Sequence, residues 1–413
     1  MRLSPRATFA LLGIALGWFN NTPSQPRTLA VGPGKQFAFP CQAIQHAKAG
    51  DTIEIDSSTV YRGDVCGWST SHLTIRGIGP TWAHIEASGK YEQGKATWVI
   101  SGDDTTIENI EFSGAAVPDG NGAAIRQEGA NLAIRNCSFH DNEEGILAGD
   151  NAKSTILVEF SQFYQNGSGD GRTHNIYVNH IAKFILRFSY SHHARVGHLV
   201  KTRAAENFIL YNRLSDEADG TASFELDIPN GGTSYVIGNI IQQGPETENS
   251  SIVAYRLEGA DPRNPGSQLY IINNTLVNDR QEGATFLQIK DDVPTPALVL
   301  NNIFYGKGVL TTQRNAVLLS NLIEKNPHFV DAAHYDYHLR PDSPARGAGD
   351  QPPVSASFPL LPAQQYVHPA CGASRVNAAK PDLGAMNSAP GLMEATAPAR
   401  CQQIGNEHEV IAR

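Results

Sequence analysis

Charged and polar side chains between residues 174 and 258 have the types and the spacing of an acid–base site. They recur along the steps of an internal repeat, on short segments that alternate polar and apolar residues. The set comprises His174, Tyr177, Asn179, His198, Lys201, Arg203, Glu225, Asp227, Arg256 and Glu258. A neutral amine can accept a proton, a guanidinium can hold a carboxylate, and a phenol or imidazole can return the proton. The set therefore predicts proton transfer on a negatively charged ligand.

The chain around these residues favours a functional site over an ordinary charged surface. Opposite charges on neighbouring strands pair at about 0.2–1 kcal/mol each, so a solvated sheet face could carry the same residues without a ligand. However, a Gly-rich loop at 167–175, the pair His192 and His193, and a tight turn at 229–232 all adjoin the patch. Binding residues are commonly carried on loops over a rigid scaffold. We therefore expect a binding or catalytic site here.

The elements that carry this patch form a repeat of short coils. An apolar–Asn–apolar unit recurs at intervals of 19–35 residues, which fits coils of short strands and turns better than helical repeats. Its steps are Asn109, Asn136, Phe160, Phe188, Asn212, Asn239, Asn274, Asn302 and Asn321, with the two phenylalanines filling the steps that lack Asn. Each coil would bury its apolar side by stacking on neighbours about 4.8 Å away. The sequence predicts an all-β fold, a right-handed parallel β-helix, with asparagines bonded along the stack.

A single strand register separates inward from outward positions, because successive strand residues face opposite sides. The two inward columns are Ile125, Ile146, Ile176, Val200, Phe224, Tyr255, Leu287 and Gln127, Ala148, Val178, Thr202, Leu226, Leu257, Ile289. Twelve of these fourteen residues are apolar, which supports the register. The same register predicts that Lys201 lies between Tyr177 and Glu225 on the outer face. It also predicts that Arg203 lies between Asn179 and Asp227.

Composition and charge exclude several classes of protein. The formal net charge is −9 and no block of five like charges occurs, which argues against a nucleic-acid binder. No Gly-x-Gly-x-x-Gly follows a strand into a helix and no P-loop is present, so no nucleotide cofactor is expected. The absence of CxxC and HExxH spacing argues against a zinc site.

The N-terminus and the cysteines point to an oxidising compartment. Arg2 and Arg6 precede an apolar run at 7–19, which predicts an export signal over 1–24; an uncleaved anchor is the alternative. A secreted or periplasmic protein is expected, with no membrane segment in its mature form. Proximity in sequence predicts disulfides Cys41–Cys66 and Cys371–Cys401 and leaves Cys137 as a lone, partly buried thiol.

Both ends of the repeat resemble a known family. The segments 39–55 and 61–63 resemble the entrance of pectate-lyase-like β-helix proteins, with a capping helix, a turn at Gly50 and a first strand. Segments 326–331, 338–339, 343–345 and 381–385 are similar to the closing segment of many bacterial members. Together with the repeat, the resemblance implies a β-helix over 25–330 and a C-terminal closing segment over 331–387, and the Ala-rich, polar composition of 388–413 predicts a tail. It does not imply one activity, because this superfamily includes lyases, hydrolases, epimerases and non-catalytic proteins.

The strand at 199–204 is partly similar to the catalytic strand of the alginate-lyase and chondroitinase-B type of polysaccharide lyase. In that family Lys is the base, Arg is the acid and Ca²⁺ neutralises the substrate, with the Arg on a neighbouring coil and the acidic ligands earlier in the chain. Here Arg203 shares the strand of Lys201, and the acids follow it. The resemblance implies that Lys201 is a base.

The leading hypothesis is a secreted polysaccharide lyase that removes the C5 proton of a uronic acid and expels the C4 oxygen. Lys201 would be the base, and Arg203 or Arg256 would hold the carboxylate. Tyr177 or His198 would donate a proton. His174, Asn179, Glu225, Asp227, Arg256 and Glu258 would bind the acidic polysaccharide, and Asn179, Glu225 and Asp227 could instead supply oxygen ligands to Ca²⁺.

Three alternatives remain. A glycoside hydrolase could use Glu225 with Asp227, or Glu225 with Glu258. Strand residues i and i+2 are about 6.6 Å apart at Cα, near the roughly 6.5–9.5 Å carboxyl spacing of inverting enzymes. A uronate C5-epimerase would use the same proton abstraction without elimination. A non-catalytic envelope protein could bind glycan along the same face.

Overall fold

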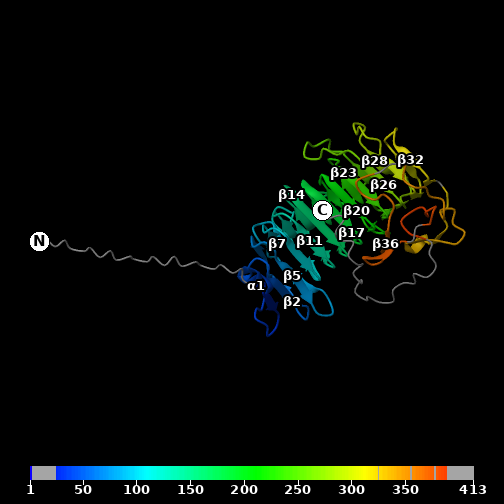
Figure 1. The fold of residues 1–413 in the computed structure, drawn as a ribbon. Coiled ribbons are helices and arrows are strands. Elements are labelled where there is room, and N and C mark those ends of the chain that lie inside the picture. Colours follow the sequence, from blue (N-terminus) through cyan, green and yellow to red (C-terminus); the bar gives the residue numbers. More distant parts are fainter. Residues whose placement is uncertain (2–24, 324, 354–355, 376–377, 388–413) are drawn as a thin grey trace.

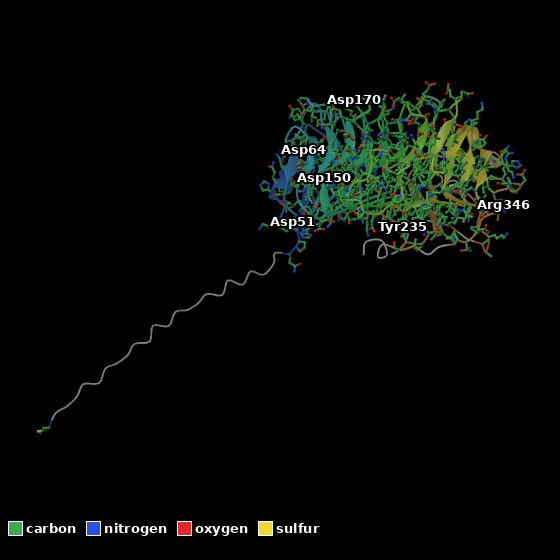
Figure 2. All side chains as sticks on the ribbon, turned by 90° about the horizontal axis from the view of Figure 1, so that it is seen from above. Asp51, Asp64, Asp150, Asp170, Tyr235 and Arg346 are labelled. Carbon is green, nitrogen blue, oxygen red and sulfur yellow. A yellow bond between two sulfur atoms is a disulfide. The ribbon has the colours of Figure 1, made fainter. Side chains whose placement is uncertain are left out.

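Three long parallel sheets wind around one apolar core in the computed structural model (Figure 1). The structure describes residues 1, 25–323, 325–353, 356–375 and 378–387. The predicted export signal, apart from Met1, and the predicted tail with Cys401 lie outside the described residues. The three sheets confirm the predicted parallel β-helix. Seen from above in Figure 2, the coil is elongated, with Asp51 near its N-terminal end and Arg346 toward the other end.

Each coil contributes one strand to each sheet. The twelve-stranded sheet contains, in spatial order, β1 (Thr28–Val31), β2 (Thr52–Asp56), β5 (Thr74–Ile78), β8 (Thr105–Glu108), β11 (Leu132–Arg135), β14 (Asn151–Glu159), β17 (Ile181–Arg187), β20 (Glu206–Leu210), β23 (Thr233–Ile237), β26 (Leu269–Ile272), β29 (Leu298–Leu300) and β32 (Val317–Leu319). The eleven-stranded sheet contains β3 (Val60–Arg62), β6 (Ala83–Glu86), β9 (Ile110–Ser113), β12 (Ser138–His140), β15 (Gln162–Tyr164), β18 (Tyr190–His192), β21 (Arg213–Ser215), β24 (Ile240–Gln243), β27 (Thr275–Asn278), β30 (Ile303–Tyr305) and β33 (Leu322–Ile323). The ten-stranded sheet contains β4 (Cys66–Trp68), β7 (Ala96–Ile100), β10 (Ala123–Gln127), β13 (Glu144–Ala148), β16 (Ile176–Val178), β19 (Lys201–Thr202), β22 (Leu226–Ile228), β25 (Ser251–Tyr255), β28 (Ala284–Ile289) and β31 (Gly308–Thr311).

The core is built from side chains that repeat at the same place in every coil. In the twelve-stranded sheet one fully buried column consists of Ile53, Ile75, Ile107, Ile134, Val158, Leu186, Ile209, Val236, Ile271 and Val299. Most of these residues are β-branched, which suits a pleated surface. In the eleven-stranded sheet Phe139 stacks on Phe112 and Phe163 at centroid distances of 5.2 and 4.7 Å. The stacked coils therefore share one continuous core.

The repeated asparagines form two neighbouring columns rather than one. Asn109, Asn136, Phe160 and Phe188 all have a positive φ at the turn after their strand, where Asn side chains tolerate the left-handed conformation. From Asn212 onward, the Asn lies one residue later, at the position that follows the left-handed residue. There the amide Nδ2 of Asn212 donates to Oδ1 of Asn239 at 3.0 Å. The contact repeats through Asn239–Asn274, Asn274–Asn302 and Asn302–Asn321 at 2.9–3.1 Å, which confirms the predicted ladder.

A disulfide and a short helix lie at the N-terminal end. Helix α1 (Pro40–His46) contacts β1, β2 and β4 and buries Cys41, Ala43 and Ile44. The disulfide Cys41–Cys66 joins it to β4, as predicted. Cys137 is unpaired, as predicted, but it is completely rather than partly buried, and burial raises the pKa of its thiol to about 12. Among the residues described, no helix has the length and apolar character needed to span a membrane.

The closing segment folds back onto the eleven-stranded sheet. It contains two antiparallel hairpins, β34 (Phe329–Asp331) with β35 (Asp336–Leu339) and β36 (Gln364–Val367) with β37 (Cys371–Ser374), and the 3₁₀ turn η1 (Ala332–His334). Phe329, Tyr337 and Tyr366 form one buried cluster with Tyr190 and Ile240, which lie on β18 and β24. The segment thus covers part of the outer face of that sheet.

Candidate active site

The ten-stranded sheet aligns three of the predicted site residues on consecutive strands. Tyr177 on β16 pairs in register with Lys201 on β19, which pairs with Asp227 on β22. Arg203 follows β19 directly, and Glu258 lies in the turn that follows β25. Tyr177, Lys201, Arg203, Asp227 and Glu258 are hereafter called the Lys201 cluster.

The register differs from the predicted one at two coils. Lys201 lies beside Asp227, not beside Glu225, and Asp227 lies beside Ala254 instead of Glu258. The predicted partner of Lys201 was wrong by two residues and that of Asp227 by four, whereas the columns before Lys201 agree with the prediction. A slip of two residues returns every side chain to the same face, so the alternation of apolar and polar residues cannot detect it.

Two cations and two carboxylates alternate in the Lys201 cluster. Lys201 Nζ lies 3.1 Å from Glu258 Oε1 and 3.5 Å from Asp227 Oδ2. Arg203 Nη2 lies 2.6 Å from Glu258 Oε2, so one carboxylate bridges the ammonium and the guanidinium. Arg203 Nε donates to the Tyr177 hydroxyl at 3.0 Å, and Arg203 Nη1 donates to Asn230 Oδ1. Both cations also lie over the Tyr177 ring, at 5.5 and 5.8 Å from its centroid.

The two carboxylates differ in burial and in charge state. The Asp227 side chain is 5% exposed, and burial raises its pKa to about 6 despite the opposing charge of Lys201. The Glu258 side chain is 47% exposed. Desolvation opposes ionisation of Glu258, but the hydrogen bond from Arg203 and the charge of Lys201 bring its pKa below the ordinary value. Glu258 is therefore an anion on the solvent side of the cluster, whereas the buried Asp227 titrates near neutral pH.

The two predicted histidines lie beneath the cluster. Their rings stack at a centroid distance of 4.4 Å, and His174 Nδ1 accepts a hydrogen bond from the backbone N–H of His198 at 2.9 Å. His198 Nε2 lies 3.5 Å from Asp227 Oδ2. Burial, reinforced by Lys201 and Arg203, lowers the pKa of His198 to about 3, and burial together with His198 lowers that of His174 well below its usual value. Both imidazoles are therefore neutral near pH 7.

Three predicted residues do not join the Lys201 cluster. Glu225 is completely buried, and the charged groups that influence it are Asp216 and Arg280; burial raises its pKa well above the usual value. The guanidinium of Arg256 faces Asp292, with Nε at 3.7 Å from its carboxylate. Asn179 is half-buried and has no hydrogen bond to the cluster in the described part of the chain. Glu225 and Asp227, two of the three predicted calcium ligands, therefore face different charged groups.

Two residues that support the site were not predicted. Asn230 accepts from Arg203 and donates through Nδ2 to the backbone oxygen of Gly259 at 3.2 Å, which ties the turn after β22 to the turn that carries Glu258. The sequence signal was the tight turn at 229–232, which directly follows Asp227. Glu144 is buried and accepts from the backbone N–H of His174 at 2.9 Å. Its position on β13 gives no local signal, because its partner lies one coil away.

Comparison with solved structures identifies the architecture. The crystal structure of pectate lyase Pel9A matches with a TM-score of 0.54 over 88% of this chain and 97% of that chain, at 13% identity. The chain has the pectate-lyase β-helix fold. A mutant of the PL6-family alginate lyase AlyGC also matches, with a TM-score of 0.37 and 17% identity over 73% of this chain and 38% of that chain. No protein-family profile and no curated protein sequence matches the chain.

Proposed function

We propose that the protein is a secreted polysaccharide lyase that cleaves a uronic-acid-containing polysaccharide by β-elimination at the Lys201 cluster. The observation that carries this proposal is the Glu258 carboxylate, which bridges Lys201 and Arg203 and is half exposed to solvent. The arrangement is a cationic cradle that already holds a carboxylate. The carboxylate of a uronic acid has the same geometry and the same charge, and it can take the place of Glu258.

The cluster then supplies the parts of an elimination. Arg203 holds the substrate carboxylate by charge-assisted hydrogen bonds and stabilises the charge that develops when the C5 proton leaves. Neutral Lys201 takes that proton, the C4–O bond breaks, and a C4–C5 double bond forms. Because Arg203 already donates to the Tyr177 oxygen, the phenolic hydrogen of Tyr177 is free to protonate the departing oxygen. Neutral His198 is a weaker acid at this position.

The charge of Lys201 sets the expected pH dependence. Since only the neutral amine can accept a proton, we expect the turnover rate to rise with pH above neutrality. No step of this scheme requires calcium.

A glycoside hydrolase is the second candidate, and a specific observation favours it. Asp227 and Glu258 lie on either side of Lys201, and their pKa values are shifted in opposite directions. Two carboxyl groups with divergent pKa values are the usual arrangement of a general acid and its partner in glycosidases. In this alternative Asp227 is the acid and Glu258 the base, in place of the predicted pairs that include Glu225.

One assay tests both functions. The protein without residues 1–24 is incubated with alginate, pectate, glycosaminoglycans and bacterial exopolysaccharides, each with Ca²⁺ and with a chelator. A lyase raises the ultraviolet absorbance of the conjugated product, and it does so faster at higher pH. New reducing ends without that absorbance would overturn the lyase proposal in favour of the hydrolase. Solvent deuterium incorporation without cleavage would indicate an epimerase, and binding without either reaction would indicate a glycan-binding protein.

A further inference from the structure

Two histidines and a glutamate meet on the outer face of the eleven-stranded sheet, which is a different sheet from the one that carries the Lys201 cluster. His84 on β6, Glu111 on β9 and His140 on β12 each present one ligand atom, and these three atoms lie within 4.8 Å of one another. All three side chains are half-buried. Within the described residues, this is the one group of three or more His, Cys, Asp or Glu side chains with that geometry.

Strand register brings the three residues together. His84 pairs directly with Glu111, and Glu111 pairs with Ser138, so His140 lies two positions further along β12 on the same face. Each residue belongs to a different coil, and neighbouring strands are about 4.8 Å apart. Sequence motifs for zinc look for ligands close together in one segment, which is why their absence from this chain does not exclude a site assembled across coils.

The imidazole of His140 is held with one nitrogen toward the site. Its Nδ1 lies 2.9 Å from Asp141 Oδ2, and its ring stacks on Tyr164 at a centroid distance of 4.9 Å. Arg195 pairs with the other oxygen of Asp141. This leaves His140 Nε2 directed at Glu111 Oε1, 2.9 Å away. A histidine whose far nitrogen is fixed by a carboxylate is the usual arrangement of a metal-binding imidazole.

A serine hydroxyl adjoins the three ligand atoms. His84 Nε2 contacts Ser113 Oγ at 2.7 Å, and Ser113 lies in register with His140. A metal ion would replace the proton between His140 and Glu111 and the one between His84 and Ser113. The Ser113 hydroxyl could then hydrogen-bond to a water molecule on the ion. Two imidazole nitrogens and one carboxylate oxygen are a ligand set that suits Zn²⁺, and three protein ligands leave a fourth position open. Calcium prefers six to eight oxygen ligands and does not match this set.

We propose that His84, Glu111 and His140 form a site for Zn²⁺ or a similar first-row divalent ion, with a solvent molecule as the fourth ligand. The ion would link three consecutive coils through their side chains. The site lies on a different sheet from the Lys201 cluster, so metal binding can be measured separately from the proposed elimination.

Calorimetric titration with Zn²⁺ tests the proposal on chelator-treated protein that carries no polyhistidine tag. We expect one equivalent to bind, and we expect His140→Gln and Glu111→Gln each to weaken binding at least about 100-fold, since each removes a ligand. Asp141→Asn, which changes only the support of His140, should weaken it about tenfold. The matched control is His72→Gln, because His72 also faces a carboxylate, that of Asp104 at 3.4 Å, but has no further ligand beside it.

Two further measurements do not depend on the variants. Co²⁺ bound to the unmodified protein should give the strong visible absorption of a tetrahedral site, and Zn²⁺ should abolish it. Saturating Zn²⁺ should also raise the Tm of the unmodified protein and of His72→Gln but not that of His140→Gln. Failure of the unmodified protein to bind one equivalent, or equal binding by Glu111→Gln and the parent, would overturn the proposal.

Discussion

The asparagine ladder and the Lys201 cluster are both columns of polar side chains on stacked coils, yet their side chains are satisfied to different degrees. In the ladder, the amide of Asn239 donates to Ile209 O and Asn274 Oδ1 and accepts from the backbone and side chain of Asn212. In the cluster, Asp227 is nearly buried with a pKa raised to about 6. Nearby Glu225 has no hydrogen-bond partner for either carboxylate oxygen within the described chain.

Columns of polar side chains on stacked coils therefore have two different roles in this molecule. Identical neutral amides satisfy each other from coil to coil, so that column stabilises the fold without any ligand. In the Lys201 cluster, burial raises the pKa of Asp227 and the neighbouring cations lower that of Glu258, which stays accessible to solvent; carboxyl groups with displaced pKa values are typical of sites of proton transfer. The following substitutions separate these two roles.

Lys201→Ala should have the largest effect, a loss of about 10³-fold in turnover, because the proposed base is removed. Stability should change little, since Arg203 still pairs with Glu258. The measurement is the initial rate of absorbance increase on the best polysaccharide. The control is Lys153→Ala, an exposed lysine on the twelve-stranded sheet, which should keep its activity. Unchanged turnover in Lys201→Ala would remove this residue from the mechanism.

Asn239→Ala should cost about 3 kcal/mol in free energy of unfolding, because it leaves several buried backbone and amide groups without partners. The activity of the folded fraction should stay the same, because the ladder lies on a different part of the coil from the cluster. Denaturant unfolding followed by circular dichroism gives the free energy. The exposed Asn121→Ala serves as the control. A loss below about 0.5 kcal/mol would mean that the ladder contributes little.

Asp227→Asn should change the pH dependence of stability. The folded-state pKa of Asp227, about 6, is above its ordinary value of 3.8, so its favourable contribution is present below about pH 4 and is lost as the pH rises through 6. The variant should lack this loss and be more stable than the parent by about 3 kcal/mol at pH 7. Thermal unfolding from pH 4 to 8 measures both curves. If the Tm values of the parent and of Asp227→Asn change with pH in the same way, Asp227 does not titrate near pH 6 in the folded protein.

Glu258→Ala should have the smallest effect and should also distinguish the two proposed functions. If the substrate carboxylate replaces that of Glu258, removing the internal competitor should lower KM about tenfold, equivalent to about 1.4 kcal/mol of binding, and leave kcat nearly unchanged. If Glu258 is instead a hydrolytic base, the same variant should lose turnover. Steady-state kinetics with Glu282→Ala, an exposed glutamate in the turn before β28, as the control would decide between these outcomes.

Much of the fold could be predicted from the sequence, because the same apolar and Asn positions recur in successive coils and each recurrence indicates the same structure. The parallel β-helix, the Cys41–Cys66 disulfide and the Asn stack are all confirmed. The pairing of Tyr177 with Lys201 is also confirmed. It could be predicted because the chain between these two residues has a regular coil length.

The residues that contact Lys201 from the coils after it, Asp227 and Glu258, could not be predicted in the same way. The choice between Glu225 and Asp227 depends on a shift of two residues that leaves the polar pattern intact. Glu258 reaches the cluster from a turn after its strand, so its strand position carries no information about its contacts. The group of His84, Glu111 and His140 has no local motif and becomes visible only when three coils are placed side by side.

The position of the Lys201 cluster within the stack has a further consequence. In a solenoid each coil contacts only its neighbours, so melting begins at the ends and advances inward. The coils that contribute Tyr177, Lys201 and Asp227 have four further strands of the ten-stranded sheet before them and three after them. Fraying of the terminal coils therefore reaches these residues last, and catalysis should outlast the first losses of β-structure on heating.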